Sequence, residues 1–164
     1  MGRYSYSNRL TVGDCKRLST QFFRKHGYYN KGFSSGRLKW SRDGVETGSI
    51  QFAMSTSPGM EYLHLCYTYT SSDNVKAQMD YQVKLTSTSC YYGGKRWWFI
   101  CSITANGQPC SRRVGALYLC GKYFGCRHCH NLTYSSCKNS HSMDRLFREI
   151  GIDPKLGNKI WRME

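Results

Sequence analysis

Apolar residues alternate with polar ones along the middle of the chain, between positions 36 and 85. A period of two residues is typical of a strand with one buried face. Turn-forming residues separate the alternating runs at 43–44, 57–59 and 71–74, and such short connections favour antiparallel pairing. The pattern therefore predicts a four-stranded antiparallel meander. Its inward positions are Leu38 and Trp40; Ile50, Phe52 and Met54; Leu63, Leu65, Tyr67 and Tyr69; and Met79, Tyr81, Val83 and Leu85.

The apolar period changes to about 3.6 residues in the N-terminal part, which predicts an amphipathic helix. Thr11 and Asp14 have the spacing of a capping box, and Gly27 offers a C-terminal stop. We expect this helix to cover the apolar face of the sheet. Its apolar positions are Val12, Cys15, Leu18, Phe22 and His26. Its other side carries cations that suit either a solvated surface or a binding role: Lys16, Arg17, Arg24 and Lys25.

Charge is distributed unevenly along the chain. The 164 residues include 24 Lys and Arg and 10 Asp and Glu, for a net charge of +14. Residues 1–42 hold ten cations and one acid, residues 43–94 two and five, and residues 95–164 twelve and four. Two basic ends around a scaffold suit a polyanionic partner, and nucleic acid is the expected one. The chain shows neither a membrane-length apolar run nor a signal-peptide pattern, so we expect a cytoplasmic protein without a membrane partner.

Nine cysteines are poorly explained by disulfides in a reducing compartment. Cys126 and Cys129 have the close spacing of a metal-binding step, and Cys101 and Cys110 form a second, looser pair. Two ligand pairs on facing hairpins predict one structural zinc ion bound by these four thiolates. Other residues remain open as replacements for one ligand: Cys120, Cys137, His128 and His130. The remaining cysteines are expected to be small core residues: Cys15, Cys66 and Cys90.

Catalytic patterns are weak throughout the sequence. Four thiolates fill the coordination sphere of zinc and leave no open position for a substrate. The Gly-Gly-Lys step at 93–95 is followed by Arg96, whereas a phosphate-binding P-loop requires Ser or Thr there. The Cys-His-Asn step at 129–131 hints faintly at a histidine-metal nuclease, but only His141 and Asp144 follow it. We therefore expect a non-enzymatic protein without a small-molecule substrate.

Further apolar periodicity predicts two short helices near the end of the chain. Ser142 can cap the first, which Gly151 ends, and Asp153 can cap the second, with Pro154 at its first position. The predicted fold class is α+β and mostly β: an antiparallel meander sheet with an N-terminal helix, followed by a zinc-ribbon lobe and short C-terminal helices. The expected domains are 1–94 for helix and sheet, 95–137 for the zinc ribbon, and 138–164 for a short helical basic tail.

Four segments carry a recognisable pattern. Residues 93–101 read Gly-Gly-x-Arg-x-x-Phe-x-Cys, residues 110–114 Cys-x-Arg-Arg-Val, residues 117–118 Leu-Tyr, and residues 126–134 Cys-Arg-x-Cys-x-x-Leu-x-Tyr. This pattern resembles a family of uncharacterised bacterial proteins that are common in proteobacteria and mobile elements. The chain departs from it at Ser102, where Pro is frequent, and at Cys120. The resemblance implies the same cysteine quartet as the metal site and no particular activity.

The leading interpretation is a non-enzymatic nucleic-acid-binding protein with a structural zinc ribbon and a basic, aromatic surface. Trp97 and Trp98 face opposite sides of one strand, so at least one should pack into the core. The alternative is a protein-binding adaptor or inhibitor, encoded by a mobile element, that docks on a host enzyme or defence complex. The sequence leaves open the partner, DNA or RNA, and the oligomeric state. The candidate nucleic-acid contacts are Lys95, Arg96, Arg112, Arg113, Lys122, Arg127, Tyr91, Tyr92 and Tyr123.

Overall fold

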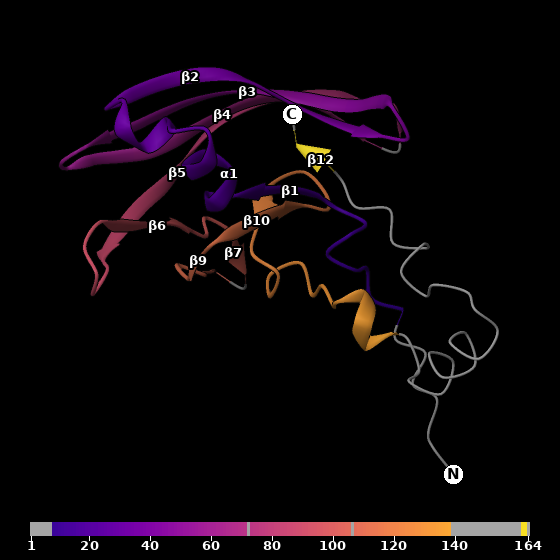
Figure 1. Cartoon of the computed structure of the whole chain (residues 1–164). Helices are drawn as coiled ribbons and strands as arrows, with labels where there is room; N and C mark the ends of the chain where they lie inside the picture. The colour runs from indigo at the N-terminus through magenta and orange to yellow at the C-terminus, as the bar shows by residue number, and fades with distance from the viewer. Residues whose placement is uncertain (1–7, 72, 106, 139–161, 164) are drawn as a thin grey trace, which may run out of the picture.

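The computed structural model describes residues 8–71, 73–105, 107–138 and 162–163. Strands dominate this part of the chain, and most of them belong to one curled antiparallel sheet (Figure 1). Neighbours in that sheet follow the order β12 (Arg162–Met163), β2 (Phe33–Arg42), β3 (Val45–Ser57), β4 (Met60–Thr70), β5 (Lys76–Ser89), β6 (Lys95–Ile100) and β9 (Arg113–Val114).

The predicted meander is confirmed as β2 to β5. Each strand pairs antiparallel with the next, and the connections lie where turn residues were expected. Asp43 and Gly44 both have positive φ, 54° and 81°, as a two-residue hairpin turn requires. Strand β5 is long and curved, and it carries the chain from the upper layer of Figure 1 to the lower layer, where β6 and β9 lie.

A second sheet brings the N-terminal segment against the C-terminal half of the chain. It has the order β1 (Lys16–Ser19), β10 (Ala116–Leu119) and β11 (Phe124–Gly125), all antiparallel. A two-stranded hairpin, β7 (Thr104–Ala105) with β8 (Gln108–Pro109), projects beyond β6. Two short 3-10 helices complete the described elements: η1 (Tyr28–Asn30) and η2 (Ser135–Cys137).

The predicted N-terminal helix is wrong over its first half. Only α1 (Thr20–Lys25) is helical, and residues 16–19 are strand β1. Thr11 and Asp14 do make the expected contact, with the Thr11 amide 2.7 Å from the Asp14 carboxylate, but they close a turn. The helix begins after Ser19, whose hydroxyl accepts from the Phe22 amide. Pairing with β10 outweighs the local helical period, because it satisfies the same backbone groups and buries Leu18.

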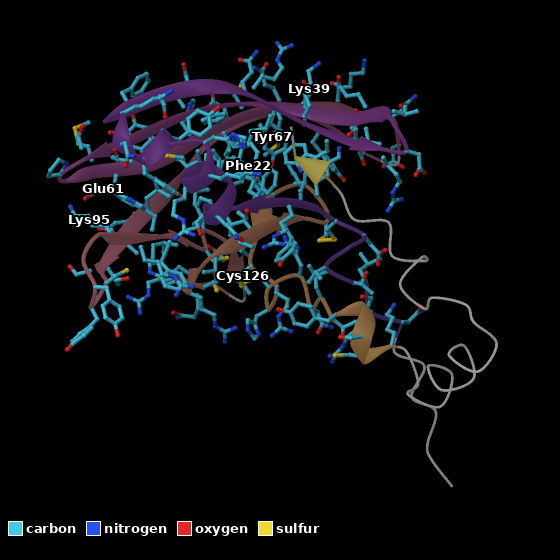
Figure 2. The ribbon with its side chains drawn as sticks, viewed as in Figure 1. Phe22, Lys39, Glu61, Tyr67, Lys95 and Cys126 are labelled. Carbon is cyan, nitrogen blue, oxygen red and sulfur yellow. A yellow bond between two sulfur atoms is a disulfide. The ribbon has the colours of Figure 1, made fainter. Side chains whose placement is uncertain are left out.

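The core lies between the curled sheet and the strands beneath it. Phe23 of α1 is fully buried, with its ring centroid 5.3 Å from that of Phe52 on β3 and 6.2 Å from that of Phe99 on β6. The helix therefore covers the apolar face of the sheet through Phe23, whereas Phe22, one of the positions expected there, is only partly buried and His26, another, is exposed. Figure 2 places Phe22 and Tyr67 toward this interior and Cys126 in the lower layer. Trp40 is also fully buried, and its indole N–H donates to the Arg17 carbonyl at 3.2 Å.

The predicted C-terminal helices, at 142–151 and from 153 onward, lie outside the described residues except at 162–163, which are strand and not helix. Arg162–Met163 forms strand β12, which pairs with β2 at the edge of the large sheet. The three domain boundaries stay a prediction; strand β6, at the proposed start of the second domain, pairs with both β5 and β9. Within the described ranges, no helix has the length and apolar character needed to cross a membrane.

Candidate metal centre and basic cavity

Four cysteine sulfurs from two separate segments meet at one point in the lower layer. Cys101, Cys110, Cys126 and Cys129 have Sγ atoms that all lie within 4.8 Å of one another. The Sγ atoms of Cys101 and Cys129 are 3.8 Å apart, and those of Cys110 and Cys126 are 3.9 Å apart. Cys101 and Cys126 are buried, whereas the other two are partly exposed. This cluster can hold a metal ion.

The first cysteine pair is positioned by the end of β6 and the hairpin that follows it. Cys101 directly follows the last residue of β6, and Cys110 directly follows the β7–β8 hairpin. The Cys110 amide donates to the Ile103 carbonyl at 2.9 Å. Ser111 adopts a positive φ of 49° and turns the chain back. The Cys101 amide then donates to the Arg112 carbonyl at 2.9 Å. The two sulfurs are thus fixed by backbone bonds on both sides.

The second pair lies in a tight turn immediately after β11. The His130 amide donates to the Cys126 carbonyl at 3.2 Å and closes the turn. Two amides point at sulfur: that of Cys126 lies 3.3 Å from the Cys101 Sγ, and that of Cys129 lies 3.4 Å from the Cys126 Sγ. Amide donors stabilise a thiolate, so the turn suits ionised ligands.

Burial opposes ionisation of these thiols. It raises the pKa of Cys101 and, strongly, that of Cys129. Burial acts against ionisation at Cys110 as well, yet a backbone hydrogen bond from Arg112 and contacts with the neighbouring thiols leave the pKa of Cys110 lowered. Close thiolates repel one another, and a cation at their centre would compensate that repulsion.

The alternative ligands lie outside the cluster. Cys120 forms a disulfide with Cys15, with the Cα atoms 5.2 Å apart, and Cys137 is exposed on η2. Cys15 is buried, as expected of a small core residue, but it is also covalently bonded, because strand pairing between β1 and β10 brings it opposite Cys120. Cys90 is exposed rather than buried, because it lies in the β5–β6 turn. Neither histidine belongs to the cluster of potential ligand atoms.

The predicted nucleic-acid contacts fall into three groups. Tyr91 and Tyr92 project from the β5–β6 turn with 96% and 97% of their surface exposed. Beside them, Arg96 and Arg113 both lie over the ring of Trp98, with guanidinium carbons 4.2 and 5.6 Å from its centroid. Lys95 and Arg112 are exposed on the same strands or next to them. The third group lies elsewhere and comprises Lys122 and Tyr123 in the β10–β11 turn. The remaining predicted contact, Arg127, belongs to none of these groups and lies in the Cys126–Cys129 turn.

The two tryptophans are both half-buried. Trp97 stacks on Tyr29 with ring centroids 5.1 Å apart and planes 8° from parallel. The indole N–H of Trp98 donates to the Thr88 hydroxyl at 3.0 Å. Trp97 thus packs against the core, as expected of one of the pair, while Trp98 supports the arginines on the surface.

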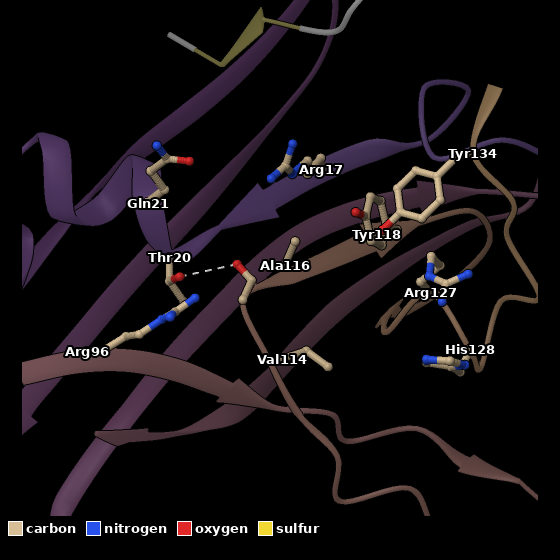
Figure 3. A pocket seen from close by; sticks show the side chains of 11 residues that line it. Arg17, Thr20, Gln21, Arg96, Val114, Ala116, Tyr118, Arg127, His128 and Tyr134 are labelled. Atoms are coloured by element: carbon tan, nitrogen blue, oxygen red, sulfur yellow. Dashed lines mark hydrogen bonds between the residues drawn. The ribbon is translucent and has the colours of Figure 1, made fainter. Parts of the chain in front are cut away.

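A cavity of about 380 Å³ lies beside the cysteine cluster and is basic (Figure 3). Arg17 from β1, Arg96 from β6 and Arg127 from the Cys126–Cys129 turn line it. None of its lining residues, all of them in the described part of the chain, is Asp or Glu. The other lining residues are Thr20, Gln21, Val114, Gly115, Ala116, Tyr118, His128 and Tyr134.

Of the three arginines that line the cavity, Arg17 is the one that the sequence did not indicate as a contact. It was one of four cations on the polar side of the expected helix, and nothing local distinguishes it from the other three. Pairing of β1 with β10, about 100 residues away in sequence, is what brings Arg17 opposite Tyr118 and beside the segment that carries Cys126 and Cys129. Comparison of the chain with protein-family models, with curated proteins and with solved structures finds no match.

Proposed function

We propose that this protein binds nucleic acid through a basic and aromatic surface that one structural zinc ion holds in place. The observation that carries the proposal is the convergence of Arg17, Arg96 and Arg127, from three separate elements, on a cavity whose lining, among the described residues, contains no carboxylate. Arginine presents a planar fork of donors that matches phosphate oxygens. Phosphate contacts supply much of the affinity of proteins for nucleic acid.

Zinc is the metal that best suits the cysteine cluster. Zinc–thiolate bonds of about 2.3 Å in a tetrahedron place the sulfurs about 3.8 Å apart. The separations of 3.8 and 3.9 Å in two of the sulfur pairs agree with that edge length. With four thiolates the coordination sphere is full, so the role of the zinc is structural.

The zinc ion connects folding to the proposed binding surface. Structural zinc contributes on the order of 10 kcal/mol of apparent binding free energy, which becomes folding free energy of the segment it holds. Arg112 and Arg127 lie within two residues of a cysteine ligand. Their positions therefore depend on the closed cluster, and so does the wall of the cavity that Arg127 and His128 provide.

Aromatic groups beside the cations support nucleic acid as the partner. Arg96 and Arg113 lie over Trp98, which holds both guanidinium groups at the surface. Tyr91 and Tyr92 are almost fully exposed at the neighbouring turn. Exposed aromatic rings among cations are the arrangement on which proteins stack unpaired bases.

The test is fluorescence anisotropy with labelled single- and double-stranded DNA and RNA, between about 50 mM and about 200 mM salt. We expect binding that weakens steeply as salt rises. The double variant Arg96→Gln/Arg113→Gln should lose roughly tenfold or more in affinity and show a smaller salt dependence. The matched control is Arg24→Gln/Arg37→Gln, which removes the same charge from exposed positions on α1 and β2.

Two outcomes would contradict the proposal. One is an absence of binding to every nucleic acid at low salt by zinc-loaded protein. The other is an equal loss of affinity in the test and control variants, since that would mean that net charge alone draws the polyanion. The first outcome would favour the protein-partner function.

A further inference from the structure

We propose that the cavity between β1, β6 and the Cys126–Cys129 turn binds the terminal phosphate monoester of a nucleic-acid strand. This inference rests on the proposed function and adds a specific ligand to it. A surface that only follows a strand needs cations spread along a path. Here Arg17, Arg96 and Arg127 stand on three sides of one hollow (Figure 3). Such an arrangement suits a single, strongly charged group.

The charge of the lining matches a monoester better than an internal phosphate. A phosphate monoester carries about −1.5 to −2 charges at pH 7, because its second pKa is near 6. An internal phosphodiester carries about one negative charge. The lining holds three arginines, and no acidic side chain among the described lining residues offsets their charge. A dianion therefore gains more than a monoanion from entering this cavity.

Two of the three arginines are held in place by neighbouring groups. The guanidinium carbon of Arg96 lies 4.2 Å from the centroid of Trp98. That of Arg127 lies 5.2 Å from the centroid of Tyr134, and its Nη1 donates to the Leu132 carbonyl at 3.4 Å. Positioned donors lose less side-chain entropy when the ligand binds. The cavity is thus partly organised before a phosphate enters.

The size and lining of the cavity also leave room for the nucleoside that carries the phosphate. A volume of about 380 Å³ falls within the range of about 300–1,000 Å³ found for small-molecule sites. Tyr118 and Tyr134 present aromatic surface on one side, and Gln21 and His128 offer polar groups. An aromatic wall can pack against a terminal base that has no neighbour on one face.

The experiment compares oligonucleotides of about 12 nucleotides by anisotropy at about 150 mM salt. One carries a 5′-phosphate, one a 3′-phosphate and one hydroxyls at both ends, with the label at the opposite end from the phosphate. A hydroxyl-ended oligonucleotide lengthened by one or two residues matches the added charge. We expect one phosphorylated end to bind roughly tenfold tighter than the charge-matched strand; the 5′ and 3′ arms identify which end.

Arg17→Gln should remove that preference. The affinity of this variant for the phosphorylated strand should lie within about twofold of its affinity for the charge-matched strand. Arg24→Gln, which removes an exposed charge from α1, should keep it. Arg17→Lys keeps the charge without the planar fork and should retain only part of the preference. Thermal unfolding followed by circular dichroism checks that the variants fold, and Arg17 is suited to substitution because its side chain is exposed.

Equal affinity for phosphorylated and charge-matched strands would overturn this inference and leave nucleic-acid binding standing. No binding to any strand would overturn both. A phosphorylated peptide that binds in an Arg17-dependent manner, while the oligonucleotides show no preference for an end, would assign the cavity to a different partner and would likewise overturn the inference.

Discussion

Gly125 is buried at the point where strand β11 meets the first cysteine of the tight turn. A Cβ atom at this position would lie 2.7 Å from Cγ1 of Ile103 and 2.8 Å from Nε2 of His130. Both neighbours belong to the segments that carry the cysteine cluster. The residue before Cys126 must therefore be small for the two segments to close on each other.

Gly125→Ala should lower the free energy of unfolding by about 1–3 kcal/mol, because the added methyl group overpacks a closed site. The measurement is urea denaturation of the metal-loaded protein. Gly121→Ala is the matched control in the same hairpin, since a Cβ there meets no atom within 4 Å. Equal stability of the two variants would show that the segments tolerate the methyl group.

Tyr67 connects the large sheet to the segment that leads into the cysteine cluster. Its buried hydroxyl donates to the Lys122 carbonyl at 2.7 Å and lies 3.1 Å from the Tyr81 hydroxyl, which in turn accepts from the Phe124 amide at 2.9 Å. Burial, and after it the contact with Tyr81, raises the pKa of Tyr67 well above its ordinary value. The neutral phenol is thus the form that the fold requires.

Tyr67→Phe should lower the free energy of unfolding by about 1–2 kcal/mol at neutral pH, because it leaves the Lys122 carbonyl without this donor. The folded pKa of Tyr67 is raised, so its contribution is fully present below the ordinary tyrosine pKa of 10.0 and is lost as pH rises above that value. Denaturation of wild type and variant at about pH 8 and about pH 11 tests this. A stability difference that grows with pH would contradict it.

Among the secondary-structure elements, β1 and β10 are joined by a covalent bond as well as by backbone pairing. The disulfide joins Cys15 to Cys120, which have a sequence separation of 105, and so links the two ends of a long stretch of chain. It lies at the end of the paired strands, beside Tyr118 and Leu132 in a small apolar cluster. The bond holds the N-terminal segment, and with it Arg17, against the lower layer.

Replacing both Cys15 and Cys120 by Ala should lower stability by roughly 2–5 kcal/mol, since the bond restricts a long segment of the unfolded chain. Denaturation under oxidising conditions measures the loss. A thiol reductant should lower the stability of the wild type to that of the variant and should leave the stability of the variant unchanged. If oxidised wild type and variant unfold at the same denaturant concentration, the bond does not contribute to the fold.

The elements that sequence predicted correctly are those fixed by local patterns. Alternation and turn residues suffice for β2 to β5, because each strand pairs with its neighbour in sequence. The cysteine quartet was predictable as a cluster because metal ligands require particular side chains at short spacings. Strand β1 was not predictable, since its partner strand is about 100 residues away and the spacing of Cys15, Leu18 and Phe22 fits a helix equally well. The cavity was missed for the same reason.

In the molecule as a whole, two layers share one core but depend on different interactions. The upper layer buries large side chains, among them Trp40, Met54 and Leu65, and contains no residue of the cysteine cluster. The lower layer consists of short strands, of two to six residues, around that cluster. These strands nevertheless place Phe99, Leu117 and Phe124 in the shared core. The proposed zinc ion would therefore order the turns that carry the cysteines and, with them, Arg112 and Arg127.

Metal content per chain, measured by elemental analysis of protein purified with a thiol reductant and no chelator, bears most directly on this view. The wild type should contain one zinc ion per chain. Cys90→Ser should contain the same, because Cys90 is exposed and outside the cluster. Cys126→Ser should contain none. Wild-type protein without metal, or Cys126→Ser with a full equivalent of zinc, would contradict a zinc ion held by these four thiolates.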